Sequence, residues 1–369
     1  MDKKTEISYD YGKKSPFVLE RNTIFIPCEI NDTTYLLYYN SNIGGLLREN
    51  ISGNADFPKC NKKMTFRMKT SANHRIILKT GLKFYDIESD FFRFKKFVGL
   101  ITSQSNDTVV PKCMSEKNLN RFVVGREAFP NRNFVMFLSF SDSTIRLIDT
   151  VSQYDTAAYT FVNSIYSCNG LSIYLTVDSI EYAFLFNTGD KQSLTLPYCG
   201  KYKECSSEKC DYFDVQYEKH KKENDIYIAS YRNTNIIDTL VIQQINPITM
   251  GYLDSITGNI IYSKRTKQPI VGMAFISQFD WIIDSQKGKI YAKKIKETQA
   301  FVNPYHVSVF DTSLRISLLP VGETEYELFS IIDSVNGEKV NAENICQMRE
   351  LLNKKDGFKN NQIVILPPL

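Results

Sequence analysis

The sequence has few of the residues that enzymes use for metal binding and phosphate binding. Among its 369 residues there are three histidines, His74, His220 and His306, and one tryptophan. It has no glycine-rich phosphate loop and no serine in a nucleophile elbow. The histidines lie too far apart in the chain to give the spacing of a metal-ligand motif. We therefore expect no cofactor and no metal, and nucleotide-dependent or serine-hydrolase chemistry has no support.

Long apolar runs and a strong net charge are also missing. No stretch approaches the ~18–20 apolar residues of a membrane-spanning helix. The net charge of +4 is small for this length, so we expect neither a nucleic-acid partner nor an anionic membrane surface. The segment Met1–Lys4 has no apolar core behind it, which argues against a secretory signal. The protein is then cytoplasmic, unless a leader has been removed and it is periplasmic or secreted.

Aromatic and β-branched residues are abundant instead. The chain contains 22 tyrosines and 24 phenylalanines, and valine, isoleucine and threonine recur in short runs. These residues favour the pleated, half-buried surface of a sheet. The composition predicts a mainly β protein with ample core for more than one domain.

One short pattern occurs twice. Residues 35–42 read YLLYYNSN, and residues 182–189 read YAFLFNTG. In each copy an apolar run ends in asparagine, a hydroxyl residue, and then asparagine or glycine. The run predicts a buried strand and the polar end a tight turn. Asn40 and Asn187 are 187 − 40 = 147 residues apart.

The same offset holds on both sides of the two turns. Upstream, the two-residue polar turn Asn31–Asp32 corresponds to Asp178–Ser179, so each copy predicts a hairpin that leads into the asparagine turn. Downstream, an apolar strand ends at Val124-Gly125 in one half and at Val271-Gly272 in the other, and 272 − 125 is again 147. Several matched anchors at one offset indicate an internal duplication.

This arrangement resembles the pepsin-like and retropepsin-like aspartic proteases. In that family each lobe has a hydrophobic strand that ends in Asp-Thr/Ser-Gly, and an apolar-apolar-Gly strand some 80 residues later runs beside it. The resemblance implies two pseudo-symmetric β-barrel lobes, at residues 16–150 and 151–298, after a polar segment at 1–15 that is disordered or at a sheet edge.

The sequence departs from the family pattern at the catalytic positions. Asn40 and Asn187 stand where the resemblance places the two aspartates, and Asn42 replaces the first glycine. Ser41, Thr188 and Gly189 keep the family pattern. The aspartic mechanism needs two carboxylates about 3 Å apart that share one proton, and an amide fills neither role.

The resulting hypothesis is a pseudo-protease rather than an enzyme. It would bind an extended peptide or protein segment in a cleft between the lobes by strand addition. The alternative is an active aspartic endopeptidase with an altered dyad that this pattern does not identify. A cysteine–histidine pair through Cys168 or Cys199 is a third, weaker option.

The segment from residue 304 to 369 has a different pattern. It predicts strands, a Val-Asn-Gly turn at 335–337, a helix capped at Asn341, and a last strand at 362–366. This order resembles the later part of a PDZ domain, although Phe329-Ser330 stands where that family usually has Gly-Asp. The alternative is an unrelated small α+β cap.

Eight cysteines leave the redox state open. Cys199, Cys205 and Cys210 lie in or beside a polar loop. Cys205 and Cys210 could close a small loop, as a bridge in the second lobe of pepsin-like enzymes does. Free thiols are an equal alternative, and a metal site with His220 as fourth ligand is a weaker one.

Overall fold

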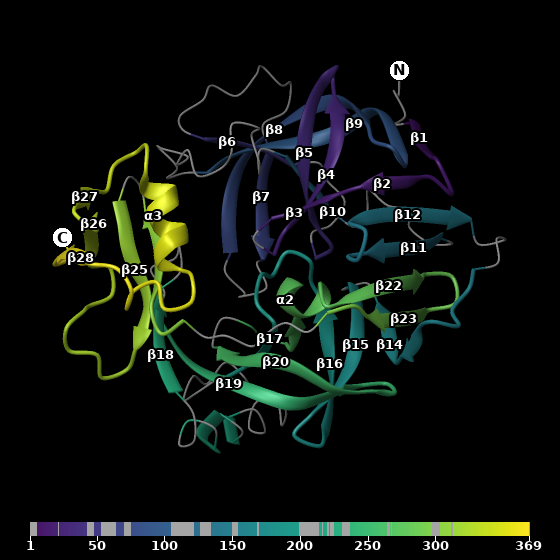
Figure 1. The fold of residues 1–369 in the computed structure, drawn as a ribbon. Helices are drawn as coiled ribbons and strands as arrows, with labels where there is room; N and C mark the ends of the chain where they lie inside the picture. The colour runs from purple at the N-terminus through teal and green to yellow at the C-terminus, as the bar shows by residue number, and fades with distance from the viewer. Residues whose placement is uncertain are drawn as a thin grey trace.

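The structure of the protein is a computed structural model (Figure 1). It describes residues 6–20, 22–42, 48–52, 64–69, 75–104, 122–125, 134–149, 154–167, 170–198, 214–215, 217–219, 221, 225–230, 237–263, 266, 268–296, 303–310 and 313–368. The predictions for Cys199, Cys205 and Cys210 fall outside these residues, and so do those for Cys168 and His220.

The first lobe is a β-barrel. Its strands are β1 (Glu6–Tyr9), β3 (Val18–Leu19), β4 (Ile24–Ile30), β5 (Thr33–Asn40), β6 (Arg48–Ser52), β7 (Met64–Lys69), β8 (Arg75–Glu88), β9 (Phe92–Gln104) and β10 (Phe122–Gly125). Six of them form a ring in the order β4-β5-β10-β6-β9-β8, which closes because β8 pairs with both β9 and β4. The side chains of Ile24, Ile26 and Leu37 are fully buried in its core.

The second lobe closes in the same way. Its elements are β14 (Ser164–Ser167), β15 (Gly170–Val177), β16 (Ile180–Phe186), β17 (Leu194–Pro197), β18 (Asp225–Ser230), β19 (Ile237–Met250), β20 (Leu253–Ser263), β21 (Ile270–Val271) and α2 (Met273–Ile276). The ring order is β15-β16-β21-β17-β20-β19, closed by the pairing of β15 with β19. In both rings the second and third strands are parallel, and so are the fourth and fifth. The prediction of a mainly β protein with two β-rich lobes is confirmed.

Both predicted hairpins are present, and their turns have the same backbone geometry. Asn31 and Asp32 have φ of 48° and 63°, and Asp178 and Ser179 have φ of 49° and 67°. Two successive residues with positive φ match the right-handed twist of the flanking strands, and asparagine and aspartate tolerate this region better than most residues. Each turn therefore sends its second strand, β5 or β16, back across the barrel toward an asparagine turn.

A third sheet is shared between the lobes. It contains β2 (Lys14–Pro16), β11 (Phe134–Ser139), β12 (Thr144–Asp149), β13 (Thr160–Val162), β22 (Phe279–Asp284) and β23 (Lys289–Lys294). The order is β13-β23-β22-β11-β12-β2, so the hairpins of the two lobes meet at the antiparallel pair β11–β22 (Figure 1, right). The N-terminal segment supplies edge strands, since β1 pairs with β9 and β2 with β12.

The C-terminal unit has its own small core. It consists of β24 (His306–Phe310), β25 (Ser313–Pro320), β26 (Ile331–Val335), β27 (Glu338–Lys339), α3 (Ile345–Leu352) and β28 (Ile363–Leu366). Val307, Leu314 and Leu352 are among its fully buried side chains. The predicted cap is wrong by three residues: the side chain of Asn341 accepts the N–H groups of Glu343 and Asn344 in a preceding turn, and α3 begins after Asn344.

This unit is also continuous with the second lobe. Strand β25 pairs with β18, with Ile228 opposite Leu319, and Leu318 packs on an apolar cluster that includes Tyr227 and Leu240. On α3, Cys346 is disulfide-bonded, whereas Cys28 in the first lobe is a buried free thiol. The domain boundaries at 150–151 and 298–304 remain predictions.

Ending the chain after Lys296 tests the last boundary. Because the C-terminal unit has a separate core, we expect the truncated lobes to keep a cooperative thermal transition. Removal of β25 uncovers the edge of β18, and an uncovered edge promotes association. Size-exclusion chromatography under reducing conditions should show dimers or larger species, which Ile228→Lys on that edge should suppress. Loss of the cooperative transition would place the C-terminal unit inside the folding core.

Candidate functional site

The two asparagine turns lie at corresponding places in the two barrels. Asn40 ends β5 beside the parallel strand β10, where Gly125 is its partner in register. In the second lobe the N–H of Asn187 donates to the carbonyl of Val271 at 3.0 Å. Each turn is therefore held against an apolar-apolar-Gly strand, Phe122–Gly125 or Ile270–Gly272.

The turns contact each other across the lobes through two hydroxyl groups, which we call the hydroxyl clamp of Ser41 and Thr188. The N–H of Ser41 donates to Thr188 Oγ1 at 2.9 Å, and the N–H of Thr188 donates to Ser41 Oγ at 3.0 Å. Each hydroxyl then donates to a main-chain carbonyl of the opposite lobe, Ser41 to Phe186 at 3.1 Å and Thr188 to Tyr39 at 3.3 Å. This reciprocal pattern sets the lobes in register.

Both asparagine side chains fold back on their own turns. Asn40 Oδ1 accepts the N–H of Asn42 at 3.0 Å, and Asn187 Oδ1 accepts the N–H of Gly189 at 2.9 Å. Asn187 is 6% exposed, and Asn40 is half-buried. A Cβ on Gly189 would overlap the carboxamide of Asn40. The carboxamide of the first turn is thus packed on the main chain of the second.

Gly272 is the second position where a side chain has no room. A Cβ there would overlap the carbonyl oxygen of Gln192 and lie 2.9 Å from that of Asp190. Its N–H donates to the carbonyl of Ser193 at 2.8 Å. The close approach explains why an apolar strand must end in glycine beside this turn.

The chemistry available at the paired turns is that of neutral amides and hydroxyls. An amide donates and accepts hydrogen bonds but neither gives up nor takes a proton near neutral pH. Asp190, the nearest carboxylate in sequence, accepts the N–H of Gln192 at 2.9 Å within its own turn. Among the residues that the structure describes, no three His, Cys, Asp or Glu side chains form a metal site.

Below the clamp lies a small, mainly apolar cavity of about 40 Å³. Its lining includes Ser41, Met136, Leu138 and Phe186. The volume suffices for ordered water and not for a drug-sized ligand. The cavity therefore belongs to the interface between the lobes and gives no separate binding site.

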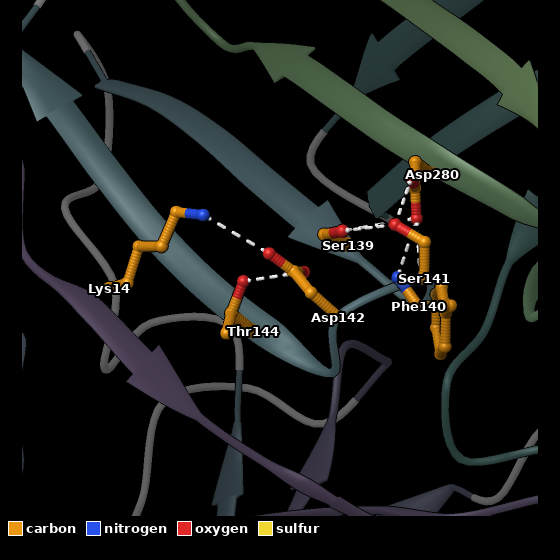
Figure 2. A network of polar contacts seen from close by, with 7 residues as sticks. All are labelled: Lys14, Ser139, Phe140, Ser141, Asp142, Thr144 and Asp280. Carbon is orange, nitrogen blue, oxygen red and sulfur yellow. Dashed lines mark hydrogen bonds and ion pairs between the residues drawn. The ribbon is translucent and has the colours of Figure 1, made fainter.

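Sequence patterns did not point to a buried carboxylate in the shared sheet. Asp280 on β22 is 4% exposed and binds the β11–β12 turn of the other lobe (Figure 2). Its Oδ1 accepts the N–H groups of Phe140 at 2.7 Å and Ser141 at 2.9 Å, and the Ser139 hydroxyl at 3.2 Å; its Oδ2 accepts the Ser141 hydroxyl at 2.7 Å. The sequence pattern that could have indicated this buried carboxylate is an aspartate between two aromatic residues, Phe279-Asp280-Trp281.

The outer end of this network is ionic. Lys14 on β2 lies 3.1 Å from Asp142, which also accepts the Thr144 hydroxyl at 2.8 Å (Figure 2). Burial acts to raise the pKa of Asp142, but the hydrogen bonds from Ser139, Thr144 and Lys14 outweigh it and leave the pKa lowered. Both ionic partners are exposed, so the pair adds little stability.

In the C-terminal unit, a side chain that follows α3 hydrogen-bonds the main chain of strand β24. Asn353 accepts the N–H of Val307 at 2.8 Å and donates to its carbonyl at 2.9 Å, as a neighbouring strand would. Beside it, His306 is exposed on β24. Desolvation lowers its pKa, and the charges of Arg349 and Lys191 act in the same direction.

Two further features carry no candidate chemistry. The thiol of Cys28 is buried, and burial followed by the charge of Glu29 raises its pKa, which makes it unreactive. No helix in the described part of the chain is long and apolar enough to cross a membrane.

The comparisons with known proteins find similarity in structure and none in sequence. No protein-family profile and no curated protein matches the sequence. Among solved structures, the crystal structure of basic 7S globulin from soybean matches with a TM-score of 0.42 and 9% sequence identity. That match covers 76% of this chain and 94% of the globulin.

Proposed function

We propose that this protein is a catalytically inactive relative of the aspartic proteases that binds an extended peptide or protein segment between its lobes. The observation that carries the proposal is the meeting of two asparagine turns across the hydroxyl clamp. Aspartic catalysis requires one carboxylate to take a proton from water and another to donate one to the substrate. Asn40 and Asn187 stand at the two positions and perform neither step.

The intact frame around the turns supports binding over a purely structural role for the lobes. Four cross-lobe hydrogen bonds of Ser41 and Thr188 hold the turns in a fixed register. Amides in place of carboxylates remove the like-charge repulsion of a dyad. A neutral, preorganised site suits the alternating N–H and C=O groups of an uncharged, extended segment.

The test restores the missing groups. Asparagine and aspartate are nearly isosteric, so Asn40→Asp and Asn187→Asp should both fold. We expect the unaltered protein to leave a mixed peptide library uncut between about pH 3 and pH 7. The double variant should cut it weakly, about 100-fold above either single variant, since acid–base groups contribute 10²–10⁴. If the double variant does not bind a transition-state-analogue inhibitor of aspartic proteases, Asn42→Gly is added to make a triple variant with the family's glycine in the first turn.

Binding of a transition-state-analogue inhibitor, measured by calorimetry, separates the outcomes. Cleavage by the unaltered protein that disappears with the inhibitor would favour the alternative, an active peptidase with other catalytic carboxylates. A folded triple variant that neither cuts nor binds the inhibitor would mean that no peptide-binding cleft exists. Peptide binding by the unaltered protein, with no cleavage, is the expected result.

A further inference from the structure

A chain of hydrogen bonds crosses from the first asparagine turn to the second lobe through Tyr38. The phenol of Tyr38, on β5, donates to the carbonyl oxygen of Gly189 at 3.1 Å. The same phenol oxygen accepts Asn40 Nδ2 at 3.5 Å. The chain of hydrogen bonds begins at Asn42, whose N–H donates to Asn40 Oδ1 at 3.0 Å. Every bond in the chain runs in one direction, from donor to acceptor.

The direction is fixed because a phenol has one proton. That proton goes to Gly189, which is a carbonyl and accepts only, so the oxygen of Tyr38 faces Asn40 with a lone pair. An amide meets it with an N–H. A carboxylate would meet it with a second lone pair and would have to take the proton away from Gly189. We infer that Tyr38 is a positioning residue that selects an amide over a carboxylate at position 40.

The second asparagine turn has no tyrosine at the position that corresponds to Tyr38. The residue that corresponds to Tyr38 at the offset of 147 is Leu185 (38 + 147), which has no polar side-chain atom. Asn187 keeps the matching bond to its own turn, from the N–H of Gly189. The two asparagines therefore differ in what holds them, and Asn187→Asp shows the effect of a carboxyl in a turn that has no phenol beside it.

The carboxamide of Asn40 contacts Tyr38, Asn42 and Gly189, and among these three only Tyr38 has an ionisable side chain. On β10 the register partner is Gly125. The charged residues that follow Gly189 in the second lobe are Asp190, which accepts the N–H of Gln192, and Lys191. Both charges lie in the turn of Asn187, so Asn187→Asp senses them as well.

The inference rests on the proposed function in one respect, that Asn40 stands where an aspartic protease has a carboxylate. Its test needs no peptide. Urea unfolding of Asn40→Asp, Asn187→Asp and Tyr38→Phe/Asn40→Asp is followed from pH 3 to pH 8, with the pKa of the new carboxyl read by NMR. The carboxyl introduced at position 40 faces the phenol lone pair. Its pKa should therefore be higher, by at least about one unit, than the pKa of the same carboxyl in Tyr38→Phe/Asn40→Asp. A carboxyl introduced at position 187 has its pKa raised by burial instead, because Asn187 is 6% exposed.

The sign of the pH effect follows from that shift. A carboxyl whose pKa is higher in the folded state keeps its full stability below the unfolded pKa of about 3.9, and loses it as pH rises through the folded value. Asn40→Asp should therefore match the unaltered protein near pH 3 and weaken toward pH 7. Removing the phenol oxygen with Tyr38→Phe should make this pH dependence of stability smaller.

Two results would overturn the role of Tyr38: a carboxyl at position 40 whose pKa is not raised, or a pH profile of Asn40→Asp that Tyr38→Phe leaves unchanged. If Asn40→Asp does not fold at any pH, the single variant Tyr38→Phe, with Asn40 unchanged, tests the role of Tyr38. Its NMR spectrum should show the side-chain amide signal of Asn40 displaced and that of Asn187 in place, and displacement of neither refutes the inference. None of these measurements depends on peptide binding, so their failure leaves the proposed function standing.

Discussion

Replacing Thr188 by valine should lower the free energy of unfolding by about 2–3 kcal/mol. Valine keeps the shape of the side chain but removes two hydrogen bonds of the hydroxyl clamp, the one accepted from Ser41 and the one donated to Tyr39. Thr188 is 1% exposed, so water does not replace what is lost. Urea unfolding by circular dichroism measures the change.

Two further variants make this result specific. Thr34→Val, at an exposed position on β5, should change stability by less than about 0.5 kcal/mol. Each hydroxyl makes its own two hydrogen bonds and the two hydroxyls share none, so Ser41→Ala with Thr188→Val should cost about the sum of the single changes. A loss at Thr188 no larger than at Thr34 would show that the clamp does not hold the lobes.

Replacing Asp280 by alanine should destabilise the protein still more, by about 3–5 kcal/mol. The carboxylate accepts four hydrogen bonds from residues 139–141 of the other lobe. Its loss leaves the two N–H groups of the β11–β12 turn without their acceptor. The free energy of unfolding in urea, together with the slope against urea concentration, checks whether the lobes still unfold together.

Asp280→Asn separates charge from shape. The asparagine oxygen can still accept the two N–H groups, and its amide can donate to Ser141, so we expect a loss of only about 1 kcal/mol. Asp142→Ala, at the exposed end of the same network, should cost less than about 1 kcal/mol. A small effect at Asp280 would mean that the turn is held by the sheet alone.

Local patterns predicted the hairpins and the fold class. The turns at Asn31–Asp32 and Asp178–Ser179 need positive φ, and residues that tolerate it stand at both places. The order of strands around each ring was not predicted. It depends on parallel pairs between distant strands, such as β6 with β9, and short apolar runs give no signal for which distant strand they join.

Most of the contacts that sequence reasoning missed are between parts of the chain far apart. Tyr38 looked like one more apolar residue in a buried strand, because its role depends on the carbonyl of Gly189 in the other lobe. The pairing of β25 with β18 was missed because an edge strand has the same residue pattern whether or not a partner covers it. The helix cap was wrongly predicted at Asn341 because an asparagine side chain begins a turn as readily as a helix.

The disulfide of Cys346 implies a covalent tether. Cys28 is free, and every other cysteine of the sequence lies at or before residue 210, so the bond encloses a loop of at least 346 − 210 = 136 residues. A protease that nicks the backbone near residue 300 would therefore not release the C-terminal unit, and the two fragments would part on a gel only after reduction. The tether also restricts the unfolded chain, which for loops of this length is worth about 4–5 kcal/mol. Such a bond forms and persists under oxidising conditions.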